Sequence, residues 1–162
     1  SVSNSASVRA SQLAQVKKGA SLNHHAGNAS GKSGNNGSGD AEQDYQKAFN
    51  LLANKKYDEA KSAFQQFLQN NTDSSYVPNA HYWLGEIYLQ QKQNKLALQE
   101  FNTVINDYNN NSKVPDAILK RATIYTQQGK NQQAKQDLQV IIKKYPDSSA
   151  ARLASMQLKT LS

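Results

Sequence analysis

Few side chains in this sequence have the types and spacing that catalysis or metal binding requires. The chain has no Cys, which excludes thiolate nucleophiles, disulfides, zinc–thiolate sites and lipid attachment through Cys. The adjacent pair His24 and His25 lacks the further ligands of a specific metal site, and His81 is expected to be a surface or packing residue. Asp58 and Glu59 are neighbours on a predicted helix and point to different sides, whereas a glycosidase pair must flank one bond. The sequence predicts no enzyme, no cofactor and no metal.

One stretch, residues 26–33 (AGNASGKS), matches a relaxed phosphate-binding loop with Ala in place of the first Gly. Such a loop needs a buried strand before it and a helix after it whose N-terminus faces the phosphates. The flanking segments SLNHH and NNGSGD form neither. We therefore expect no nucleotide site.

Charge and hydropathy exclude two further classes of protein. The 19 Lys plus Arg exceed the 12 Asp plus Glu, but the longest basic runs are pairs, so nucleic-acid binding is not expected. The longest aliphatic run, residues 140–142, is far shorter than the ~20 apolar residues of a membrane-spanning helix. Since the chain begins at Ser without a signal-peptide pattern, we expect a processed or truncated protein whose export signal has been removed.

Composition divides the chain at Asp40. Six of the eight Gly and nine Ser lie in residues 1–40, whereas all 13 aromatic residues lie in residues 41–162. The first segment cannot bury enough apolar surface to offset the entropy of ordering, which predicts a flexible low-complexity linker. Its start, with Val8, Leu13 and Val16, is also compatible with the end of a truncated coiled-coil region.

The second segment repeats every 37 residues. Each period contains two helical patterns joined by a short polar turn, so every unit is predicted to be a helical hairpin. A small residue stands where the two helices of a hairpin would cross, and a large apolar residue stands beside it. The positions that keep this phase are Ala48, Gly85 and Ala122; Ala60, Ala97 and Ala134; Phe64, Phe101 and Leu138; Phe67, Val104 and Ile141; and Ser75, Ser112 and Ser149.

This pattern resembles the tetratricopeptide repeat, whose Leu-Gly, Tyr, Ala and Phe positions correspond to Leu84-Gly85, Tyr88, Ala97 and Phe101. The predicted fold is all-α: a tetratricopeptide-repeat solenoid of three helical hairpins over 41–147, with residues 149–161 as a C-terminal capping helix. The three residues beyond the usual 34 precede the first helix of a unit, where Ser75 or Ser112 can cap the helix and a Pro is tolerated in its first turn.

The stretch His81-Tyr82-Trp83-Leu84-Gly85-Glu86-Ile87-Tyr88, preceded by Tyr76-Val77-Pro78-Asn79-Ala80, resembles the C-terminal domain of the YbgF/CpoB family of Tol-Pal-associated proteins. The resemblance spans residues 41–162. It implies a periplasmic location, binding to TolA, and a role in coordinating outer-membrane constriction with peptidoglycan synthesis at division. It also implies an N-terminal coiled coil that oligomerises the full-length protein, and this sequence shows no sustained heptads.

The first helices of stacked hairpins line an inner groove, which is the expected partner-binding surface. Tyr82 and Trp83 are expected to be partly exposed there, although their size also suits packing between hairpins. Phe64, Phe67, Tyr88, Phe101 and Tyr125 are expected in the core. The predicted groove residues are Tyr45, Phe49, Leu52, Asn79, Tyr82, Trp83, Glu86, Leu89, Asp116, Leu119, Lys120 and Thr123, with Glu42 beside them.

The function predicted is therefore a non-catalytic protein-interaction module that binds TolA and other Tol-Pal or peptidoglycan-synthesis proteins. Tyr45 and Phe49 stand where a clamp for a C-terminal carboxylate would need Lys and Asn, so docking of a helical or extended segment is favoured. Two alternatives remain open: a tetratricopeptide subunit of an outer-membrane assembly complex, and a structural oligomerisation module whose groove is filled by a neighbouring copy.

Overall fold

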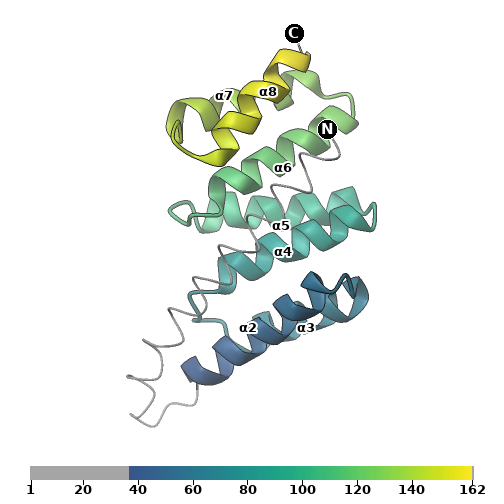
Figure 1. The fold of residues 1–162 in the computed structure, drawn as a ribbon, viewed down its shortest axis with the longest axis vertical. Helices are drawn as coiled ribbons and strands as arrows, with labels where there is room; N and C mark the ends of the chain where they lie inside the picture. The colour runs from purple at the N-terminus through teal and green to yellow at the C-terminus, as the bar shows by residue number, and fades with distance from the viewer. Residues whose placement is uncertain (1–36, 162) are drawn as a thin grey trace. The chain divides into compact units, whose positions relative to one another are not determined.

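The structure, a computed structural model, describes residues 37–161, and all regular elements in this range are α-helices (Figure 1). The predictions for His24, His25 and residues 26–33, and most of the predicted linker, lie outside the described residues. No helix in the described range is long and apolar enough to cross a membrane. The helices are α2 (Gly37–Ala53), α3 (Tyr57–Asn70), α4 (Val77–Gln90), α5 (Asn94–Asp107), α6 (Val114–Gln127), α7 (Asn131–Lys144) and α8 (Ser149–Leu161).

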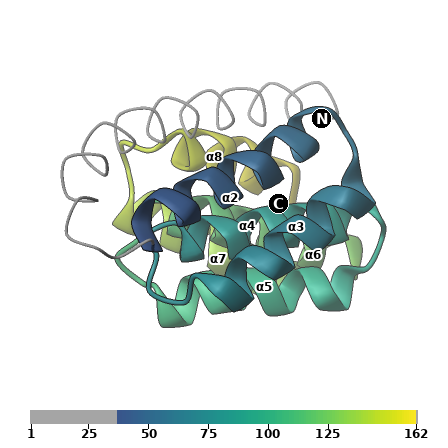
Figure 2. The same cartoon turned by 90° about the horizontal axis from the view of Figure 1, so that it is seen from below.

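The described residues form two compact units, one ending at Val77 and one beginning at Pro78. In the first unit, α2 and α3 pack against each other as a helical hairpin (Figure 2). Tyr45 is the centre of its core, because its ring contacts the rings of Phe49, Phe64 and Phe67 on these two helices. The ring of Tyr76 stacks on Tyr45 at a centroid distance of 4.5 Å.

The second unit contains the other two hairpins and the last helix. Helix α6 packs against both α5 and α7, and α8 packs against α7 and α6 (Figure 1). Arg121 on α6 joins the two hairpins: its guanidinium donates two hydrogen bonds to Asp137 on α7, at 2.8 and 2.9 Å, and one to Asn102 on α5 at 2.9 Å. The predicted hairpins and the closing helix at residues 149–161 are confirmed.

Each hairpin turns through the same backbone motif, 37 residues apart. Lys55, Lys92 and Gly129 follow the first helix of each hairpin and have φ of 61°, 61° and 75°. The next residue donates its N–H to a carbonyl five positions back, as Lys56 does to Leu51, which is the hydrogen bond of a Schellman C-cap. Glycine takes this left-handed conformation at low cost, so two of the three turns hold it with a strained lysine.

The caps that begin the first helices differ from the prediction. Ser75 and Ser112 accept no capping bond; instead Ser74 Oγ accepts the N–H of Tyr76 and Asn111 Oδ1 accepts the N–H of Lys113. Before α8, Ser148 Oγ accepts the N–H of Ala151. The polar acceptor thus precedes the predicted serine by one residue, because the chain makes a tight turn before the helix starts.

Gly85 shows why the crossing point of a hairpin needs a small residue. A Cβ built on Gly85 would lie 2.6 Å from Cε1 of Phe101, far inside normal carbon–carbon contact. Backbone of α4 therefore lies directly against the Phe101 ring of α5. The predicted pairing of a small residue with a large one at the crossing is confirmed here.

Candidate protein-interaction site

The predicted groove residues divide into a buried and a half-buried set. Buried are Tyr45, Phe49, Leu52, Tyr82, Trp83, Glu86 and Leu119, together with Glu42. Half-buried are Asn79, Leu89, Asp116, Lys120 and Thr123. The half-buried set lies entirely in the second unit, on α4 and α6.

The expected partial exposure of Tyr82 is wrong, and Trp83, for which both groove and core were open, is in the core, because both side chains are 0% exposed. Their rings contact each other edge to face at 4.9 Å, and Tyr82 also packs on Phe101 at 5.7 Å. Position on the helix was outweighed by ring size: large rings that can reach neighbouring helices bury more apolar surface there than at a groove wall. Of the expected core residues, Phe64, Phe67 and Phe101 are buried, whereas Tyr88 and Tyr125 are only half-buried.

A charged cluster lies between α4 and α6 in the second unit. Lys120 Nζ is 2.8 Å from Glu86 Oε1, and the Glu86 side chain is 3% exposed. Asp116 is one helical turn before Lys120 on α6. Because a buried ion pair is costly when either partner is removed, Glu86 and Lys120 hold each other in place.

Lys113 adds a second cation to this cluster. Its Nζ lies 4.8 Å from the centroid of the Trp83 ring and 5.1 Å from that of Tyr82, within range of a cation–π interaction. Burial lowers the pKa of Lys113, while the charges of Asp116 and Glu86 act in the opposite direction. Sequence reasoning did not include Lys113 among the site residues. The signal was its spacing: it stands 37 residues after Tyr76, in the same position of the repeat.

His81 lies on another side of α4, in contact with α5. His81 Nδ1 lies 2.9 Å from Glu100 Oε2, and the imidazole stacks on Tyr108. This contact joins α4 to α5 and fits the packing role expected for His81. Within residues 37–161, no group of three or more His, Asp or Glu is placed to hold a metal ion.

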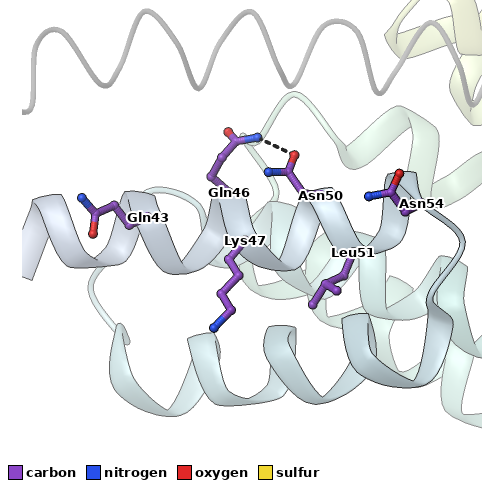
Figure 3. A pocket seen from close by; sticks show the side chains of 6 residues that line it. All are labelled: Gln43, Gln46, Lys47, Asn50, Leu51 and Asn54. Carbon is purple, nitrogen blue, oxygen red and sulfur yellow. Dashed lines mark hydrogen bonds between the residues drawn. The ribbon is translucent and has the colours of Figure 1, made fainter.

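A shallow hollow lies on one face of α2 (Figure 3). Its described lining is mostly amide side chains, and the Gln46 amide donates a hydrogen bond to Asn50 Oδ1 at 3.1 Å. The hollow shares no residue with the predicted groove. The side chains that line it are Gln43, Gln46, Lys47, Asn50, Leu51 and Asn54.

Comparison with protein families identifies the class. Two tetratricopeptide-repeat models match the chain, one over residues 40–112 and the other over residues 116–148. The chain therefore belongs to the tetratricopeptide-repeat family. A crystal structure of a tetratricopeptide repeat protein from Parabacteroides merdae ATCC 43184 has the same fold, with a TM-score of 0.62 and 19% identity, covering 95% of this chain and 55% of that one.

More specific similarity is to the cell division coordinator CpoB. The protein from Escherichia coli (strain K12) is 49% identical over 51 residues, which are 31% of this chain and 19% of that protein. The protein from Pseudomonas putida (strain KT2440) is 47% identical over 45 residues, 28% of this chain and 17% of that protein. The aligned part spans about a fifth of the length of these relatives. These findings support a repeat domain of the YbgF/CpoB type, as the sequence predicted.

Proposed function

We propose that this chain is a non-catalytic periplasmic interaction module that binds TolA and helps coordinate outer-membrane constriction with peptidoglycan synthesis during cell division. The observation that carries the proposal is the similarity of its repeats to proteins named cell division coordinator CpoB. TolA is the partner that the family resemblance implies. The tetratricopeptide fold suits such a role, because stacked hairpins present an extended surface to a peptide or helix.

The proposed binding surface in the second unit is the half-buried set on α4 and α6. Its side chains combine an apolar group, Leu89, with amide, hydroxyl and charged groups, among them Asp116 and Lys120. The buried rings of Tyr82 and Trp83 lie in the same helix as Leu89 and stiffen this surface from within. Rigid support of this kind lowers the entropy lost on binding.

The test is a calorimetric titration of the periplasmic part of TolA into the full chain and two matched double variants. One variant places glutamates on the proposed surface, Asn79→Glu with Thr123→Glu. The control places glutamates on exposed positions of the second helices, Gln99→Glu with Gln139→Glu. Both variants add two negative charges, so only their location differs. Truncation of Tyr82 or Glu86 is avoided, since both are buried and would test folding.

We expect the surface variant to bind TolA at least about tenfold more weakly, because crowding an interface centre costs more than about 1.4 kcal/mol. The control should bind within about twofold of the parent chain. Failure of the parent chain to bind TolA would contradict the proposed function. Equal weakening of both variants would contradict the surface but not the function, because it would show a general charge effect.

A further inference from the structure

Two residues that stand 37 positions apart lie directly before α4 and α6. In the first unit this residue is Tyr76, whose ring lies on Tyr45. The Tyr76 hydroxyl donates a hydrogen bond to Glu42 Oε1 at 3.3 Å. Tyr76 thus packs on an aromatic ring, and its buried hydroxyl has a carboxylate acceptor within the same unit.

The second unit keeps an aromatic ring at this place but has a lysine where the first unit has Tyr76. Tyr82 stands 37 residues after Tyr45, and Lys113 stands 37 residues after Tyr76. The Lys113 ammonium lies over the rings of Tyr82 and Trp83, and Lys113 as a whole is only 5% exposed. We call Tyr82, Trp83 and Lys113 the Lys113 site. A neutral hydroxyl in the first unit is therefore replaced by a charge in the second.

The carboxylate acceptor is not repeated. The residue 37 positions after Glu42 is Asn79, and the described contacts of Lys113 Nζ are with the faces of the Tyr82 and Trp83 rings. Two carboxylates, Glu86 and Asp116, are near enough to act on Lys113 through charge without bonding to it. Glu86 is held by Lys120 at 2.8 Å. The ammonium has three donors and contacts two ring faces that satisfy its charge only in part.

Burial of this ammonium has a consequence for binding. Much of the cost of removing water from Lys113 is already met in the folded chain, so an incoming carboxylate need only lose its own water. Hydrogen bonds between charged groups are also stronger where water is excluded. A single ammonium, without the planar fork of an arginine, suits one carboxylate oxygen.

We propose that Lys113 anchors an acidic side chain, Asp or Glu, of the protein partner in the second unit. The inference deepens the proposed function, on which it rests, by stating the chemistry that the partner must bring. An internal acidic residue is favoured over a C-terminal carboxylate, because the chain lacks the Lys and Asn of a carboxylate clamp at Tyr45 and Phe49. The partner segment supplies in the second unit the acceptor that Glu42 supplies in the first.

The first experiment measures TolA binding by the full chain and three variants. Lys113→Met removes the charge and keeps the length of the side chain, Lys113→Arg keeps the charge, and Lys92→Met is the control at an exposed lysine. Loss of one charge-assisted hydrogen bond should weaken binding about 10- to 100-fold in Lys113→Met. Lys113→Arg should retain most of the affinity, and Lys92→Met should bind as the parent chain does. Thermal melts of each variant report folding separately.

The second experiment does not depend on TolA. Trp83 is the sole tryptophan of the chain, so its fluorescence reports on the Lys113 site. N-acetyl-glutamate amide and N-acetyl-glutamine amide are titrated as matched probes, one with a carboxylate and one without. The acidic probe should change the Trp83 emission in a saturable way, the neutral probe should not, and Lys113→Met should abolish the response.

The two experiments separate the site from the function. If TolA does not bind but the acidic probe acts through Lys113, the proposed function fails and the site stands. If TolA binds Lys113→Met as tightly as the parent chain, the anchor is refuted while the proposed function survives. If TolA does not bind and the two probes give the same response, both proposals are refuted.

Discussion

Adding one methyl group to Gly85 tests whether close backbone packing is what holds the second hairpin together. In Gly85→Ala the new Cβ would lie 2.6, 2.7 and 2.9 Å from three carbons of the Phe101 ring. Normal carbon contacts are about 3.5–4.0 Å, so the ring or the helix must move by about 1 Å. Overpacking of this size costs about 1–3 kcal/mol, and alanine recovers about 1 kcal/mol of helix propensity. We expect a net loss of about 0–2 kcal/mol.

The sequence offers a matched partner variant for this prediction. The third hairpin pairs Ala122 with Leu138, at the positions that Gly85 and Phe101 occupy in the second. Phe101→Leu should therefore cost less in the Gly85→Ala background than in the parent chain. Urea unfolding, monitored by circular dichroism and by Trp83 fluorescence, gives the free energy of unfolding of the parent chain, the two single variants and the double variant. We expect a coupling energy of about 1 kcal/mol or more.

Additive effects of Gly85→Ala and Phe101→Leu would refute the packing argument, since two residues in steric conflict cannot act independently. A gain of stability in Gly85→Ala alone would also refute it, because helix propensity would then outweigh the clash. The first hairpin sharpens the test, as it has Phe64 and Ala48 at these positions of the repeat, both buried, without a glycine. The close approach is thus a property of α4 and α5, not of every phenylalanine at this position.

Three further predictions concern the turns and the buried charges. Lys92→Gly should raise the free energy of unfolding by about 0.5–1 kcal/mol in urea titrations, because φ at Lys92 is 61° and glycine adopts this conformation without strain; a loss of stability would contradict this. Asp137→Asn should lower the free energy of unfolding by about 1.5–3 kcal/mol, because it weakens the two hydrogen bonds from Arg121. The control Asp147→Asn, at an exposed position, should change the free energy of unfolding by less than about 0.5 kcal/mol. Burial lowers the pKa of Lys113 in the folded chain below its ordinary value of 10.5. Between the lowered pKa and 10.5, Lys113 is therefore protonated in the unfolded chain but neutral in the folded chain. The free energy of unfolding consequently rises with pH across this window. The unfolding free energy of the parent chain, minus that of Lys113→Met, should increase as pH rises toward 10.5, and a flat difference would show that Lys113 is not desolvated.

The repeat boundaries were predictable because they depend on residues close together in the sequence. A short polar turn between the two helices of each unit was expected, and the helices end and restart around residues 54–56, 91–93 and 128–130. The left-handed backbone at Lys55 and Lys92 was not expected, since lysine carries no signal for positive φ. Only comparison with Gly129, at the same position of the third repeat, gives a hint of it.

The groove was predicted less well than the helices. Counting along a helix gives the direction of a side chain but not the distance to the next helix, which decides whether that side chain is buried. Tyr82 was therefore expected at the surface and lies in the core, and the position of Trp83, open from the sequence, is also in the core. The Glu86–Lys120 pair joins residues 34 positions apart on α4 and α6, and neither residue type indicates its partner.

The sequence alone determined the repeat period, the hairpins, the closing helix and the family, because periodic apolar positions and local turn residues specify secondary structure directly. Tertiary structure decided which of the predicted groove residues are buried and brought Lys113 over Tyr82 and Trp83. These outcomes depend on contacts between helices that are distant in the sequence, and on the volume left between them. For this reason the order of helices was evident from the residues, whereas the chemistry of the binding surface was not.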